Sequence, residues 1–155
     1  MAMTPHRIQS VQFIPVPPEE AWDFFSDPWN LPRITPPWLS FELLSDPPAS
    51  MYPGLLIEYR VRPLWGISLR WLTEITHVVE PLLFVDEQRF GPYRFWHHQH
   101  RFRAAGGGVE MEDEVHYLLR GGPLGRVVQR YLVHRRLEEI FDYRRAAVER
   151  IFGSR

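Results

Sequence analysis

The feature that most constrains the fold is a period-two alternation of apolar and polar residues through the middle of the chain. It is clearest in the segments 57–62 and 67–75. Such alternation is typical of strands that cover one face and leave the other to solvent. Further strands are expected at 6–14, 39–43, 82–89, 93–103 and 109–119, with Gly- and Pro-containing turns between the later ones. Seven strands with short connections predict one antiparallel meander.

Two short helices and one long helix complete the predicted elements. Pro18 followed by Glu19 and Glu20 is typical of a helix start, so a helix is expected over 18–25 and a second helical turn over 29–34. The inner face of the first helix would carry Ala21, Trp22, Phe24 and Phe25.

The segment 123–152 predicts a long terminal helix whose broad apolar stripe must cover the sheet. Its apolar positions fall in two phases, so the helix either bends near His134 or begins there after a preceding turn. Its arginines are expected on a solvated face: Arg126, Arg130, Arg135, Arg136, Arg144, Arg145 and Arg150.

Composition excludes several classes of protein. The 155 residues include no Cys, and all 18 basic residues are Arg, which excludes disulfide scaffolds, thiolate chemistry and Schiff-base lysines. A net charge of -1 gives no support for nucleic-acid binding. No apolar run approaches the roughly 18 residues of a membrane span, and the first residues lack a secretory apolar core. We expect one cytoplasmic domain over 1–155, without stable membrane insertion and without a cofactor.

A hairpin at Gly106–Gly107–Gly108 predicts the register of the last two strands. A tight turn there places Ala104 opposite Val109 and therefore His100 opposite Asp113. The inner face would carry Trp96, His98, His100, Phe102, Val109, Met111, Asp113, Val115 and Tyr117. The opposite face would be solvated and carry His97, Gln99, Arg101, Arg103, Glu110, Glu112, Glu114 and His116.

The turn at Gly91–Pro92 extends this face to the preceding strand. If Gln88 lies opposite Trp96, then Asp86 lies opposite His98, whereas a slip of one residue would present Glu87 instead. The preferred register predicts a polar cluster within an aromatic wall, made of Asp86, His98, His100 and Asp113.

Burying such a cluster costs free energy unless its members pair with one another. The cluster is therefore either a closed structural network or an anchor for a ligand. A catalytic interpretation would use His100 as a general base oriented by Asp113. Two His and two carboxylates suffice in number for zinc or iron, but their mutual pairing would occupy the imidazole nitrogens, so no metal site is expected.

Several motifs resemble the SRPBCC (START-like, helix-grip) superfamily, and in particular a bacterial ligand-binding branch. They are Ser26-Asp27-Pro28-Trp29-Asn30-Leu31, Ile34-Thr35-Pro36-Pro37, Phe84-Val85-Asp86-Glu87-Gln88, Gly91-Pro92-Tyr93 with Trp96, His98, His100 and Phe102, Gly122-Pro123-Leu124-Gly125, and Ile140-Phe141-Asp142-Tyr143-Arg144. The resemblance spans residues 6 to 152. It implies an α+β fold in which a seven-stranded antiparallel sheet wraps around a long C-terminal helix, with two short helices after the first strand and a cavity between sheet and helix.

We expect that cavity to bind an apolar or aromatic small molecule, such as a lipid, polyketide or isoprenoid. The predicted ligand-binding residues are Tyr59, Trp71, Asp86, Trp96, His98, His100, Asp113 and Tyr117. One alternative, which the resemblance allows, is a polyketide cyclase or aromatase that uses His100 and Asp113. Another is a protein-interaction module with a filled cavity and an exposed apolar patch near Trp29 and Trp38. The oligomeric state is left open.

Overall fold

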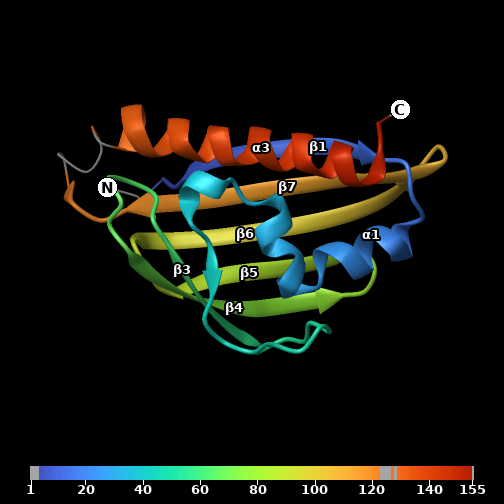
Figure 1. The fold of residues 1–155 in the computed structure, drawn as a ribbon, viewed down its shortest axis with the longest axis horizontal. Helices are drawn as coiled ribbons and strands as arrows, with labels where there is room; N and C mark the ends of the chain where they lie inside the picture. The colour runs from blue at the N-terminus through green and yellow to red at the C-terminus, as the bar shows by residue number, and fades with distance from the viewer. Residues whose placement is uncertain (1–3, 123–126, 128, 155) are drawn as a thin grey trace.

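The computed structural model describes residues 4–122, 127 and 129–154, and its elements follow the predicted order (Figure 1). The strands are β1 (His6–Ile14), β2 (Glu42–Leu43), β3 (Leu56–Val61), β4 (Leu69–Val79), β5 (Leu83–Phe90), β6 (Tyr93–Ala105) and β7 (Gly108–Leu119). The helical segments are α1 (Pro18–Phe25), the 3₁₀ helices η1 (Pro28–Ile34) and η2 (Pro37–Leu39), the π-helical turn η3 (Gln129–Val133) and α3 (His134–Phe152). The predicted α+β helix-grip fold is confirmed.

All seven strands form one antiparallel sheet in the order β1-β7-β6-β5-β4-β3-β2. The strands from β2 to β7 form the predicted meander, but β1 pairs with β7 at the opposite edge from β2. The prediction of a single meander is therefore wrong for β1, because α1, η1 and η2 carry the chain from one edge of the sheet to the other. In Figure 1 the sheet curves beneath α3.

Helix α1 begins at Pro18, as predicted, and closes one end of the fold. Its predicted inner face is confirmed, since Ala21, Trp22, Phe24 and Phe25 are all buried. The Trp22 ring meets Phe84 of β5 and Phe102 of β6 edge-on, with centroid distances of 5.8 and 5.6 Å. Edge-to-face contacts of this kind add to the free energy gained from burial, so α1 is fixed against the middle of the sheet.

The observed boundaries of β2 and β4 differ most from the predicted ones. Leu39 lies in η2 rather than in a strand, because Pro37 starts a helical turn and Ser40 ends it with a left-handed φ of 48°. Strand β4 begins at Leu69, leaving Ile67 exposed, and it continues to Val79 through register shifts against β5. These shifts bend β4 and add to the curvature of the sheet.

Helix α3 lies across the concave face of the sheet (Figure 1) and buries Leu137, Phe141, Ala147 and Val148. The helical pattern changes at the position that both interpretations predict, since the π-helical turn η3 runs directly into α3 at His134. The predicted start at residues 123–126 lies outside the described residues, and so does Arg126. No helix in the described part of the chain has the length and apolarity to cross a membrane.

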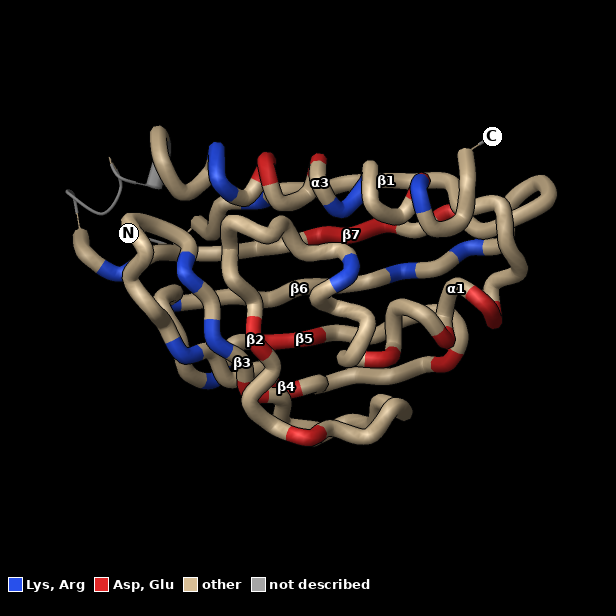
Figure 2. The backbone as a smooth tube through the Cα atoms, in the orientation of Figure 1, with Lys and Arg blue, Asp and Glu red and all other residues tan. Residues whose placement is uncertain are grey.

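The outer face of the sheet carries charged pairs rather than isolated charges. Arg103 pairs with Glu110, Arg101 lies 3.6 Å from Glu112, and Arg7 of β1 pairs with Glu114. Figure 2 shows acidic positions along β5 and β7 and alternating charges along α3. Glu114 was predicted to be solvated, but it is buried beneath the Arg7 side chain. The burial of Glu114 follows from the edge position of β1, which was not predicted.

Candidate functional site

The predicted strand registers around the polar cluster are confirmed. Strands β6 and β7 pair Ala104 with Val109 and His100 with Asp113. Strands β5 and β6 pair Asp86 with His98, so the slipped register that would present Glu87 is wrong. The β5–β6 ladder ends at Glu87 and does not include the predicted pair of Gln88 and Trp96, because the Gln88 side chain instead bonds the backbone N–H and C=O of Tyr93.

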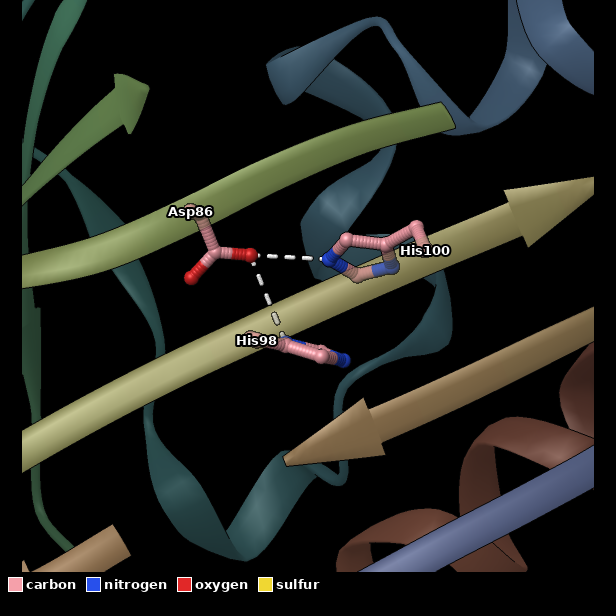
Figure 3. A group of neighbouring side chains, drawn as sticks. All are labelled: Asp86, His98 and His100. Carbon is pink, nitrogen blue, oxygen red and sulfur yellow. Dashed lines mark hydrogen bonds and ion pairs between the residues drawn. The ribbon is translucent and has the colours of Figure 1, made fainter. Parts of the chain in front are cut away.

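These registers bring Asp86, His98, His100 and Asp113 together as a closed ring of contacts. Nε2 of His100 lies 2.8 Å from Oδ2 of Asp86, and Nδ1 of His98 lies 3.3 Å from the same oxygen (Figure 3). On the other side, Nδ1 of His100 lies 2.6 Å from Oδ1 of Asp113, and Nε2 of His98 lies 3.2 Å from that oxygen. Each imidazole therefore bridges the same two carboxylates.

The charges in this ring shift one another's pKa values. Burial opposes ionisation of Asp113, but the charge of His100 and hydrogen bonds from the two imidazoles hold its pKa well below the usual range. Burial also opposes ionisation of Asp86, but the charge of His98 and the hydrogen bond from His100 lower its pKa. Burial also opposes protonation of His100, but Asp113 and Asp86 raise its pKa. Burial and the neighbouring charge of His100 lower the pKa of His98. The cluster therefore favours ionised carboxylates, and of the two imidazoles it favours protonation of His100 over that of His98.

Arg144 of α3 belongs to this site, although the sequence analysis placed it on a solvated helix face. Its Nη1 lies 3.6 Å from Oδ2 of Asp113, and its side chain is only 15% exposed. The sequence did contain a signal for this position. Residues 141, 144 and 148 lie on one helix face, and Phe141 and Val148 are buried there, so Arg144 lies within the apolar stripe. By contrast, Arg135 is 79% exposed and faces solvent as predicted.

A cavity of about 180 Å³ lies between α3 and the sheet, next to the cluster. Six of the predicted ligand-binding residues line it: Tyr59, Trp71, Asp86, Trp96, His98 and His100. Leu137, Ile140, Phe141 and Arg144 of α3 close it on the helix side. The aromatic wall is continuous, since the Trp71 ring lies 5.7 Å from Tyr59, 5.3 Å from Tyr93 and 5.1 Å from Trp96.

The other two predicted binding residues lie outside this lining. Asp113 contacts His98 and His100 but is not part of the cavity wall. Tyr117 is fully buried, and its hydroxyl lies 3.0 Å from Nδ1 of His134, at the start of α3. Burial raises the pKa of Tyr117 to about 12, so its hydroxyl stays protonated. Tyr117 therefore ties β7 to α3 and does not present a polar group to the cavity.

Three buried side-chain nitrogens of cavity-lining residues have no hydrogen-bond partner within the described residues. One is Nδ1 of His100, which lies against Asp113 without hydrogen-bond geometry, and the other two are the donors Nε1 of Trp71 and Nε of Arg144. Buried donors without partners are costly, at about 1–3 kcal/mol each. Tyr59 is different, because its hydroxyl lies 3.3 Å from Oγ1 of Thr73, and burial raises its pKa. The wall therefore offers two free donors to an oxygen-bearing molecule.

The exposed tryptophans considered for a partner surface are each held by a neighbour. Trp29 is 50% exposed, and its indole N–H donates to the carbonyl of Pro47 at 3.1 Å. Trp38 is 39% exposed, and the Arg136 guanidinium lies 4.8 Å above its ring. Their contacts attach η1 to the loop between β2 and β3, and η2 to α3. Side chains do not fill the cavity, so the structure differs from the filled cavity that the interaction-module alternative predicts.

Comparison with known proteins agrees with the fold. The sequence profile of the family described as "Polyketide cyclase / dehydrase and lipid transport" matches residues 14–141. No curated protein sequence matches this one.

Solved structures share the fold at low sequence identity. The protein TTHA0849 from Thermus thermophilus is 21% identical with a TM-score of 0.67, covering 94% of this chain and 95% of that one. A START superfamily protein from Mycobacterium smegmatis is 14% identical with a TM-score of 0.68, covering 94% and 99%. Ara h 8.0201 is 16% identical with a TM-score of 0.57, covering 92% and 97%. These likenesses show the START-like helix-grip fold.

Proposed function

The chain belongs to the polyketide cyclase/dehydrase and lipid transport family of the SRPBCC superfamily, and on that premise we propose that it binds a small aromatic or apolar molecule with an oxygen-bearing end. It is an SRPBCC ligand-binding or polyketide cyclase-like domain. The observation that carries the finer proposal is the aromatic-walled cavity with the polar cluster set into one side.

The apolar part of the ligand is expected against the aromatic wall and α3. Trp71, Trp96 and Phe141 all line the cavity, and their rings offer large flat apolar surfaces. Burying about 200 Å² of apolar ligand surface contributes about 5 kcal/mol before the cost of ordering the ligand. That is too little for tight binding, so polar contacts are needed to reach micromolar affinity or better.

The polar end of the ligand is expected near α3 and the cluster. The unpaired N–H groups of Trp71 and Arg144 would donate hydrogen bonds to acceptor oxygens of the ligand, such as those of a carbonyl or carboxylate. The guanidinium of Arg144 favours a carboxylate, since a charged hydrogen bond is roughly twice as strong as a neutral one. His98 and His100 add ring nitrogens at the same wall.

The cavity also limits the size of the ligand. An enclosed water molecule needs roughly 10–15 Å³ of cavity volume, so a cavity of about 180 Å³ holds on the order of a dozen water molecules. That space suits a molecule of one or two rings. It is below the roughly 300–1,000 Å³ typical of pockets for larger ligands. A short aromatic acid or a small polyketide fragment fits this description better than a long-chain lipid.

Native mass spectrometry of the purified protein, followed by extraction and identification of any bound compound, tests this proposal. We expect a 1:1 complex with an aromatic or apolar compound that carries an oxygen acceptor. The matched pair of variants is Arg144→Met, which removes a donor at the wall, and Arg145→Met, which removes an arginine that bonds Ser10 and Val11 instead. Equal occupancy in both variants, or a bound compound without acceptor oxygens, would contradict the proposed polar end.

A second candidate function is that of a cyclase or aromatase, favoured by the contact between His100 and Asp113. His100 lines the cavity, and Asp113 contacts its Nδ1 from outside the lining, which is how a carboxylate orients a general base. Under this alternative, His100→Ala abolishes turnover of a polyketide substrate while binding is largely retained. Unchanged turnover in that variant would exclude the catalytic role of the pair.

A further inference from the structure

The two histidines of the cluster face more acceptors than neutral imidazoles can serve. All four ring nitrogens lie 2.6–3.3 Å from a carboxylate oxygen. A neutral imidazole has one N–H and one bare nitrogen, so two neutral rings leave two bare nitrogens against carboxylates. A single imidazolium still leaves one bare nitrogen against a carboxylate. Protonating both rings would supply the missing hydrogens, but it would also place two positive charges on buried rings whose centroids are 3.8 Å apart.

The four contacts divide into two sides with different geometry. Nδ1 of His98 and Nε2 of His100 both converge on Oδ2 of Asp86 (Figure 3). The remaining two nitrogens converge on Oδ1 of Asp113. A cation on the Asp86 side would bind the two bare nitrogens, and both N–H groups would then point to Asp113. This division leaves both imidazoles neutral and places an oxygen of Asp113 within 3.2 Å of each N–H nitrogen.

The atoms on the Asp86 side are spaced as ligands of one ion. The carboxylate oxygen lies 2.8 and 3.3 Å from the two nitrogens, and all three atoms lie within 4.8 Å of one another. For metal–ligand bonds of about 2.0–2.2 Å, neighbouring ligand atoms lie roughly 2.8–3.6 Å apart, from octahedral to tetrahedral geometry. The sequence-based expectation of no metal site rested on the histidine nitrogens being occupied by the carboxylates, and this spacing gives those same contacts another explanation.

Asp113 occupies the position of the carboxylate that, in metal sites, contacts the metal-binding histidines rather than the metal. Metal-binding histidines commonly donate their other N–H to a carboxylate, which fixes the ring orientation and makes the nitrogen a better ligand. Asp113 would serve both histidines at once, and its other oxygen lies 3.6 Å from Arg144. A divalent cation would offset the charges of Asp86 and Asp113 in place of an imidazolium proton, because metal-bound imidazoles are neutral.

We infer that Asp86, His98 and His100 form a binding site for a divalent first-row transition metal ion, with its remaining coordination positions on the cavity side. Two imidazoles and one carboxylate are the donor set of open zinc and iron(II) sites, and all three residues line the cavity. The inference stands apart from the proposed function, because metal uptake is measured without any organic ligand.

The test is a titration of the metal-stripped full chain with Co²⁺, followed by visible d–d absorption and proton NMR. We expect absorption that saturates at one equivalent of Co²⁺. We also expect two strongly shifted, exchange-protected N–H protons, one from each imidazole on the Asp113 side. Asp86→Asn should weaken Co²⁺ binding by about 100-fold or more. The control is His97→Gln, because His97 lies on the other face of β6 beside Glu87 and its loss should change nothing.

Two results would overturn the inference. One is wild-type protein whose spectrum does not saturate at one equivalent or shows no shifted N–H protons. The other is binding that His97→Gln abolishes and Asp86→Asn retains, which would place the ion on the outer face of the sheet. If Asp86→Asn fails to fold, the NMR spectra of the wild type and of His97→Gln decide the question. Shifted N–H protons in both support the site, and their absence from both overturns it.

Discussion

The rings of His98 and His100 lie with their centroids 3.8 Å apart, and each ring contacts both Asp86 and Asp113. The ring of Phe84 stacks on the opposite side of His100 at 4.0 Å. The two histidines are two residues apart on β6, so their side chains share the inner face of the sheet. Strand β6 therefore holds both imidazoles at the cavity wall.

Replacing Asp113 should destabilise the fold strongly. Asp113→Asn removes the negative charge that faces His98, His100 and Arg144, and breaking a buried pair from one side costs about 3–5 kcal/mol. Urea unfolding at neutral pH measures the change. Glu112→Gln is the control, because Glu112 lies on the outer face 3.6 Å from Arg101 and should cost less than about 1 kcal/mol. Equal losses in the two variants would contradict the buried ring of charges.

The pair of Arg7 and Glu114 should make stability depend on pH. Burial opposes ionisation of Glu114, but the hydrogen bond and charge of Arg7 lower its pKa. A lowered folded-state pKa means that the pair stabilises the fold above the unfolded pKa, and that this stabilisation disappears as the pH falls through the folded pKa. Urea unfolding should therefore show wild type more stable than Glu114→Gln near pH 7, with the difference shrinking near pH 3. A difference that stays constant would rule out this linkage.

The aromatic contacts of α1 should matter more than exposed aromatics. Trp22→Ala removes a side chain that is 4% exposed and packs on Phe84 and Phe102, so we expect a loss of about 3–5 kcal/mol. Trp65 is 83% exposed, and Trp65→Ala should change stability by less than about 0.5 kcal/mol. Thermal and urea unfolding of both variants provide the comparison. A mild effect of Trp22→Ala would mean that α1 is not fixed against the sheet.

Arg144 should select ligands with an acidic end. With 2-naphthoate and naphthalene as paired probes, Arg144→Met should weaken naphthoate binding by roughly 10- to 100-fold, the loss expected for one charged hydrogen bond, and leave naphthalene binding unchanged. Quenching of tryptophan fluorescence measures both affinities, since Trp71 and Trp96 line the cavity. Arg145→Met is the control and should bind both probes as wild type does. Equal weakening of both probes would assign Arg144 an apolar packing role only.

The sequence was informative where local geometry decides the structure. The Gly106–Gly108 turn fixes the β6–β7 register, so the juxtaposition of His100 and Asp113 could be predicted from strand pairing alone. The edge position of β1 could not, because periodicity indicates which residues face inward but not which strands become neighbours. The sequence analysis placed Arg144 on a solvated face because its side chain is charged. Residue 144 nevertheless lies within the apolar stripe of the helix. The Tyr117 hydroxyl was misplaced because its contact with His134 depends on where α3 begins.

The central claim is that a small molecule binds in the cavity with its polar end at the two inward histidines. Its most direct test is NMR of the histidine rings in metal-free protein, titrated with naphthoate, cinnamate and octanoate. We predict that at least one of these acids shifts the His98 and His100 resonances saturably at one equivalent, while His77 and His97, which lie outside the cavity, do not move. If none of the acids moves His98 or His100, or if the outer histidines respond in their place, the claim is contradicted.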